Sequence, residues 1–207
     1  EQKWEEARDT AVAMEQLGIE HPYYRLARTQ LMAVQQSTET EEEARALLNA
    51  YGDSPKIQIL GAELLWKCGR HEEAAGFFRR LEEQFGNYYA AEKYLALYYQ
   101  EQGNLAEALN HCFLAQGDSD DEFLDALRKE LDIAYIEECE NALAAGTLAP
   151  EDASRLCTSY IRTEQNQKGI AFLQNHPEYT SQMEHAHKFL TILFYQDGKM
   201  TESEQEN

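Results

Sequence analysis

The sequence is poor in basic residues, and this shortage limits the partners that it favours. It has 207 residues, with 18 Lys and Arg against 38 Asp and Glu, which gives a formal net charge of −20 at pH 7. Nucleic acids and anionic membrane surfaces are themselves negative, and proteins bind them through basic surfaces. We therefore predict a partner that is neither a nucleic acid nor a membrane.

Long apolar runs, turn residues and paired cysteines are also scarce. No run of 18 apolar residues is present, so we expect no transmembrane helix, and residues 1–6 are too acidic for a signal peptide. With 11 Gly, 4 Pro and no hairpin-turn signal, the chain is predicted to be all-α. Because the chain begins without Met, a lost upstream domain stays an open possibility. The scattered cysteines favour a reducing compartment, and we expect the cytoplasm; they are Cys68, Cys112, Cys139 and Cys157.

No catalytic motif is found. The sequence has no Gly-x-Ser-x-Gly, no phosphate loop and no dinucleotide fingerprint, so we predict a non-enzymatic protein without a cofactor. The run His71-Glu72-Glu73 lacks the second histidine of a zinc-protease helix, and no metal is expected. An enzymatic alternative would need a ligand-bound pocket around Cys157, His176 and His185.

The clearest internal pattern is a repeat of 34 residues. Two antiparallel helices need small residues where they cross and a glycine where the first helix ends. Three small residues recur at that period: Ala62 and Ala96, Gly69 and Gly103, Ala74 and Ala108. The pattern returns near the C-terminus with changed letters, as Glu164 and Gly198, Cys157 and Thr191, Tyr160 and Phe194, Gly169 and Ser203.

This unit resembles the tetratricopeptide repeat. The second helix of that family carries a small residue, an aromatic four residues later and a small residue three further on; here the two units have Ala74, Phe78 and Leu81, then Ala108, Cys112 and Ala115. The family's tryptophan is missing, and Gln58 and Glu92 stand in its place. The resemblance implies an all-α solenoid of antiparallel helical hairpins, with about ten to twelve helices.

We expect three segments along the chain. Residues 1–117 form an N-terminal array whose clearest repeats are 55–88 and 89–117, preceded by a hairpin with helices at 21–36 and 41–51. A lone helix over 4–17 comes before it. Residues 118–149 hold a longer helix that runs to Ala145 before Gly146 and joins the arrays at a hinge. Residues 150–207 hold degenerate repeats.

By the family's geometry, the first helix of each unit lines a concave groove. The resemblance places seven residues there: Glu63, Trp66, Lys67, Lys93, Tyr94, Leu97 and Glu101. Tyr and Trp suit peptide recognition because they bury much area at small entropic cost. Packing between repeats is the competing interpretation of the aromatic residues.

The predicted function is a protein- or peptide-binding scaffold, and the segment that it binds is expected to be apolar or basic. The clamp with which some members hold acidic chaperone tails is disfavoured, because Ile59, Glu63 and Tyr94 stand where its polar and cationic residues belong. Two alternatives stay open: a co-chaperone or secretion-chaperone module that shields a client, and a structural module that self-associates.

Overall fold

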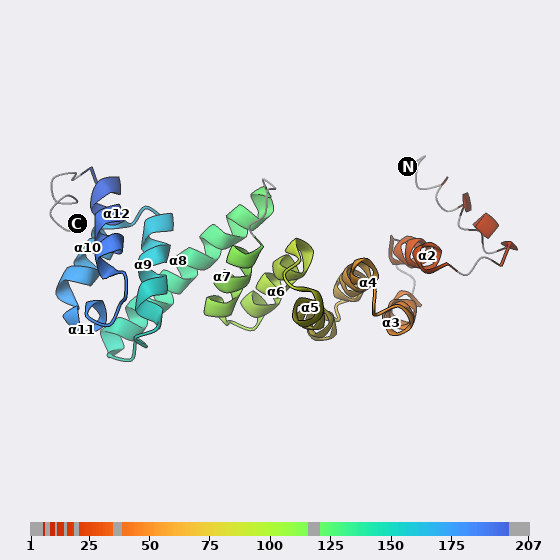
Figure 1. Cartoon of the computed structure of the whole chain (residues 1–207), viewed down its shortest axis with the longest axis horizontal. Coiled ribbons are helices and arrows are strands. Elements are labelled where there is room, and N and C mark those ends of the chain that lie inside the picture. The colour runs from red at the N-terminus through yellow and green to blue at the C-terminus, as the bar shows by residue number, and fades with distance from the viewer. Residues whose placement is uncertain are drawn as a thin grey trace. The chain divides into compact units, whose positions relative to one another are not determined.

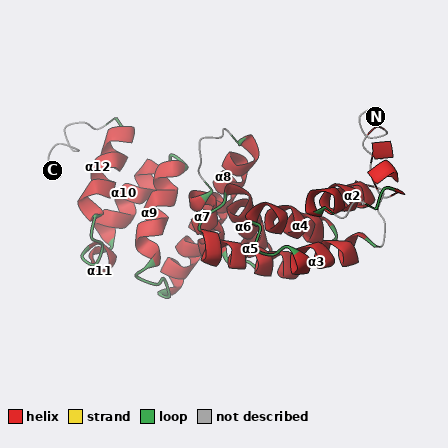
Figure 2. Ribbon diagram, turned by 45° about the vertical axis from the view of Figure 1, so that its right-hand side comes forward, coloured by secondary structure: helices red, strands yellow, loops and turns green. Residues whose placement is uncertain are grey.

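The computed structural model describes residues 6, 9–10, 12–14, 16–18, 21–34, 39–115 and 121–198. Over these ranges the chain is helical and contains no strand (Figure 2), which confirms the predicted all-α fold. Of the predicted helix over 4–17, the described residues 6, 9–10, 12–14 and 16 are helical, and Ser203 lies outside the described residues. None of the described helices is long and apolar enough to cross a bilayer. The chain divides into two compact units, Glu1–Ser119 and Asp120–Asn207.

The first unit is a stack of helical hairpins. Each helix contacts the next, and the first also contacts the third, so the helices follow one another along the unit (Figure 1). This order confirms the predicted solenoid of hairpins. The helices are α2 (Pro22–Val34), α3 (Thr40–Ala50), α4 (Pro55–Lys67), α5 (His71–Phe85), α6 (Tyr89–Glu101) and α7 (Leu105–Leu114).

Glycine turns the chain at two equivalent places in this unit. Gly69 after α4 and Gly103 after α6 have φ angles of 76° and 72°, a region that favours glycine. Behind them, the N–H groups of Arg70 and Asn104 each donate to a carbonyl five residues earlier, both at 2.9 Å. This is the Schellman ending of a helix, and it confirms the predicted turn at both glycines.

Small residues allow the helices of each hairpin to approach closely. Ala62, Ala74, Ala96 and Ala108 all have an exposed fraction of 0%, as the repeat predicts. Between these alanines lie large apolar side chains, of which Phe78 is the largest that is fully buried. The core of the unit therefore combines small residues where helices cross with large apolar side chains between the crossings.

The second unit begins with one long helix. It contains α8 (Glu122–Ala145), α9 (Asp152–Arg162), α10 (Asn166–Asn175), the single turn α11 (Pro177–Thr180) and α12 (Ala186–Gln196). Asp121 caps α8 by accepting N–H groups from Phe123 and Leu124, and Gly146 ends it with φ 70°. These ends confirm the predicted long helix before Gly146, which packs against α9 within this unit.

Glu164 lies in a turn of the second unit that resembles the glycine turns of the first unit. The 34-residue period aligns it with Gly198, and its φ is 58°, the one positive φ found at a non-glycine residue in the described ranges. The next N–H, from Gln165, donates to the Tyr160 carbonyl at 2.9 Å, as in the first unit. The turn therefore keeps its backbone shape although its residue has changed.

A buried acid fastens α8 to α9. Asp132 is 1% exposed, and both of its carboxylate oxygens accept hydrogen bonds. Arg162 donates to the two oxygens at 2.7 and 2.6 Å, and the Ser159 hydroxyl donates to one of them at 2.6 Å. The charge is paired and hydrogen-bonded, so its burial is compensated within the unit.

Candidate functional site

The predicted groove residues Trp66 and Tyr94 lie together in the first unit. Their ring centroids are 5.3 Å apart, with the rings tilted by 56°. Tyr94 also stacks on Phe78 of α5 at 5.1 Å, and Trp66 stacks on His71 at 4.1 Å. Both rings are half-buried. The two rings therefore pack between α4, α5 and α6 on one side and remain partly exposed on the other.

Three of the predicted charged residues surround this aromatic pair. Burial raises the pKa of the Glu63 carboxyl, and nearby Lys67 and Lys93 oppose that rise. Burial, followed by the charge of Glu63, raises the pKa of the Tyr94 hydroxyl. Glu63 is thus close enough to act on Lys67, Lys93 and Tyr94.

The last two predicted residues lie further along α6. Leu97 is half-buried, and Glu101 is exposed at the end of the helix. The Glu101 carboxylate bonds Nδ1 of His71 at 2.7 Å, so it reaches Trp66 only through the histidine that stacks on the indole. Glu101 therefore ties the end of α6 to the start of α5.

An apolar hollow, which the sequence did not reveal, lies at the start of α4. Its volume is about 500 Å³, and its lining includes Pro55, Ile59 and Leu60 at the start of α4 and Tyr88 before α6. Lys56, also in the lining, places its ammonium 5.3 Å from the ring of Tyr23 on α2. Ile59 and Leu60 precede Glu63 by four and three residues, so the sequence places them on the same helix face as Glu63. Only the packing brings Tyr88 to them and forms the hollow.

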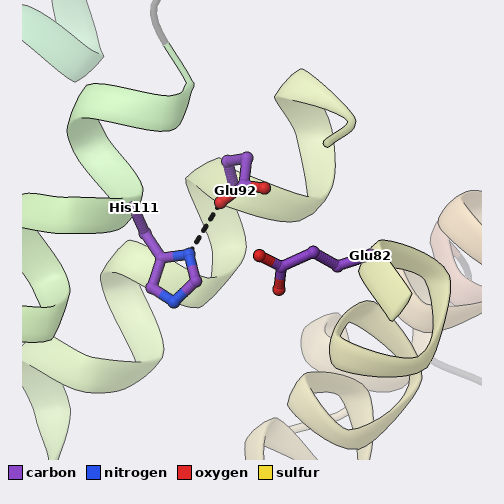
Figure 3. Close-up of side chains that lie close together, drawn as sticks. All are labelled: Glu82, Glu92 and His111. Atoms are coloured by element: carbon purple, nitrogen blue, oxygen red, sulfur yellow. Dashed lines mark hydrogen bonds and ion pairs between the residues drawn. The ribbon is translucent and has the colours of Figure 1, made fainter. Parts of the chain in front are cut away.

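A second, polar pocket lies between α5, α6 and α7. Its volume is about 450 Å³, and Glu82, Tyr99 and His111 contribute to its lining. Glu92 lies behind it with an exposed fraction of 0%, and Nδ1 of His111 donates to its carboxylate at 2.6 Å. The Glu82 carboxylate points toward this pair from α5 (Figure 3). Three different helices bring these residues together, so the sequence spacing gave no signal.

The histidines and cysteine of the enzymatic alternative do not converge. Cys157 is fully buried on α9, and burial raises the pKa of its thiol to about 12. His176 packs against Phe172, and His185 is exposed. Within the described residues, the only group of His, Cys, Asp or Glu placed to share an ion is Glu82, Glu92 and His111.

Comparisons with known proteins support the fold. No family model matches the chain, and no curated protein matches its sequence. The structure is similar to the solved structure of an IFIT1 N216A monomeric mutant with m7Gppp-AAAA, at 16% identity and a TM-score of 0.52. The matched region covers 100% of this chain and 45% of that one. A monomeric IFIT1 mutant with Gppp-AAAA is similar at 15% identity and a TM-score of 0.49, over 97% of this chain and 45% of that one.

The chain thus has a tetratricopeptide-like helical-repeat fold and spans less than half the length of those structures. The exclusion of nucleic acid that the net charge suggested is wrong, because a protein of the same fold holds a capped RNA. The physical reason is that partners meet one local face, whereas the net charge sums over every face of the molecule. The net charge of −20 therefore does not decide the partner.

Proposed function

We propose that the chain is a non-enzymatic binding scaffold, and that its first unit takes a protein segment on the face formed by α4 and α6. One observation carries this proposal: an apolar hollow lined by Ile59, Leu60 and Tyr88 lies at the start of α4, and Ile59 precedes the half-buried Trp66 by seven residues, about two turns along one face of that helix. A hollow of about 500 Å³ has the size of a small binding pocket, and apolar walls suit an apolar side chain.

Charged residues along the same face would orient the segment. Lys67 is exposed, and Lys93 and Glu63 are half-buried beside Tyr94. Rim charges of this kind affect register and association rate more than affinity, whereas buried aromatic anchors carry most of the binding energy. The proposed ligand is therefore an extended or helical segment whose apolar residue fills the hollow.

A displayed peptide library tests this proposal, with affinities of the selected peptides measured by fluorescence anisotropy. Leu60→Ser and Tyr88→Ala should each lower the affinity by about tenfold or more. The matched control is Ile133→Ser on α8, because Ile133 is 50% exposed and lies in the other unit. The control should bind like the wild-type chain.

The same assay includes m7Gppp-AAAA as a second probe. If the capped RNA binds and Leu60→Ser removes that binding while no peptide binds, the occupant is RNA and the proposal is overturned. If every selected peptide binds Leu60→Ser as well as wild type, the hollow is not the anchor.

The biological use of this binding face stays open between two alternatives. A client-shielding module and a self-associating module are the two alternative uses of the face. Sedimentation velocity over a range of concentrations separates them, because self-association would produce a species of higher mass without an added partner. The cytoplasm stays the proposed location.

A further inference from the structure

Glu92 is a fully buried acid that is only half satisfied. Its Oε2 accepts from His111, and its Oε1 is buried without a hydrogen-bond partner. An unpaired buried oxygen is costly, and native proteins keep such groups rarely and usually for a reason. The unpaired oxygen belongs to the cluster that faces the polar pocket, which points to a ligand that is supplied from outside the chain.

Two further donors meet Glu92 at this place. Glu82 reaches in from α5 and His111 from α7, and one ligand atom of each of the three residues lies within 4.8 Å of the others (Figure 3). The His111 ring is held by stacking on Tyr99, at 5.2 Å and an angle of 3°. Three donors from three helices therefore converge on one point.

We propose that Glu82, Glu92 and His111 bind a divalent transition-metal ion, and that Zn²⁺ is the ion that fits best. One imidazole nitrogen with two carboxylate oxygens suits zinc, whereas calcium and magnesium prefer ligand sets made of oxygen alone. The ion would use the unpaired oxygen of Glu92 and compensate the negative charges of the two carboxylates.

The distances allow such an ion after a small movement. Donors that share one zinc ion lie about 4 Å apart at most, since each bond is about 2.0–2.1 Å long. The present limit of 4.8 Å requires the donors to close by less than about 1 Å. Glu82 is only half-buried, so its side chain can move. The pocket of about 450 Å³ gives the ion a path and leaves room for a water as fourth ligand.

The expected role of the ion is structural. Glu82 belongs to the hairpin of α4 and α5, whereas Glu92 and His111 belong to the hairpin of α6 and α7. A shared ion would tie these two repeats together, in addition to their apolar packing. Such a tie would stabilise the folded unit by mass action when the ion is present.

Competition of the full chain with a chromogenic zinc chelator tests the proposal. The wild-type chain should bind one Zn²⁺ at this site, and the ion should raise the Tm. His111→Asn and Glu82→Gln should each lower the zinc affinity by at least about tenfold. Glu82→Gln is the variant that keeps the fold, because its side chain is half-buried and near the pocket rim, and circular dichroism verifies this.

The matched control is His71→Asn. His71 also bonds a glutamate at 2.7 Å, but no third donor of the described residues joins that pair. The control should therefore keep the wild-type zinc affinity. Equal affinity in His111→Asn and wild type, or equal loss in His71→Asn, would overturn the proposal.

Co²⁺ absorption supplies the second measurement. A site of one histidine and two carboxylates should give visible bands without a sulfur-to-cobalt band, and His111→Asn should remove them. A sulfur-to-cobalt band would place the ion at a cysteine instead and would contradict the proposed ligands.

Discussion

Among the described residues, each unit has one fully buried acid, and the two acids have opposite hydrogen-bond environments. In the second unit, Asp132 is 1% exposed, and Arg162 and Ser159 satisfy both of its oxygens. In the first unit, Glu92 is 0% exposed, and His111 satisfies one oxygen while the other stays unpaired. A complete network needs nothing further, whereas an incomplete network beside a pocket is open to a ligand.

Two tyrosines of the second unit and two aromatic residues of the first unit also differ in what surrounds them. In the second unit, the hydroxyls of Tyr135 and Tyr160 donate to Asp152 and Glu140 at 2.7 and 3.0 Å. In the first unit, Trp66 and Tyr94 rest on other rings and remain half-buried. These two tyrosines of the second unit thus have their hydroxyls paired within the unit, whereas Trp66 and Tyr94 of the first unit stay partly open.

The largest expected effect on stability comes from removing a partner of the buried Asp132 in the second unit. Arg162→Met leaves Asp132 buried with Ser159 as its remaining donor, and we expect a loss of about 4 kcal/mol in the free energy of unfolding. Urea unfolding followed by circular dichroism measures the loss. Both tryptophans, Trp4 and Trp66, lie in the first unit, so their fluorescence should change less than the circular dichroism.

The control for that variant is Arg128→Met on α8. Arg128 pairs with Asp125, whose side chain is 65% exposed, and such a pair contributes less than about 1 kcal/mol. If Arg162→Met were no more destabilising than this control, the buried network would not be the fastening of the second unit.

The second effect distinguishes packing from groove lining in the first unit. Trp66→Ala removes the ring that lies against Tyr94 and His71, and because the ring is half-buried we expect a loss of about 2 kcal/mol. Phe85→Ala, at a side chain that is 42% exposed, should cost less than about 0.5 kcal/mol. Unchanged stability in Trp66→Ala, with weakened peptide binding, would assign the ring to the groove alone.

The third effect concerns the turn that the second unit makes without glycine. Glu164→Gly relieves a φ of 58° that L-residues adopt at a cost, and we expect a gain of about 0.5–1 kcal/mol in the free energy of unfolding. Gly103→Ala, in the corresponding turn of the first unit, should lose about 1 kcal/mol. Thermal and urea unfolding check both, and a destabilised Glu164→Gly would contradict the equivalence of the turns.

The smallest expected effect is a pH-dependent change in stability at Glu82, in the cluster of Glu82, Glu92 and His111. Burial, and then the charge of Glu92, raise the pKa of the Glu82 carboxyl. Because this pKa is raised on folding, stability is lost as the pH rises through it. Glu82→Gln in a buffer with chelator should thus be more stable than wild type at pH 7, by less than about 0.5 kcal/mol, and the difference should vanish below about pH 4.

Glu73→Gln is the control of opposite sign. The hydrogen bond from Arg45 lowers the pKa of Glu73, so the wild-type group stabilises the fold above its unfolded pKa and loses that effect as the pH falls. This variant should be less stable than wild type at pH 7. Urea unfolding at several pH values measures both variants, and equal signs would refute the assigned environments.

The fold was predictable because its signals are local. Gly69 and Gly103 end helices through their own backbone freedom, and the alanines mark close crossings at a fixed period. The period also located Glu164, where the residue had changed and the backbone had not. The same reasoning places Ile59 and Leu60 on the helix face of Glu63, but the hollow there also needs Tyr88, which only packing brings to them.

The chain's residue pattern by itself determined the helices, their turns and the small residues at which they cross, since hydrogen bonding and backbone strain depend on neighbours along the chain. Only the tertiary structure decided the state of Glu92. The family resemblance placed this residue at a tryptophan position, and the sequence showed neither its burial nor its partners. Glu82 and His111 reach it from two other helices, and convergence of that kind is set by packing, which no spacing along one helix encodes.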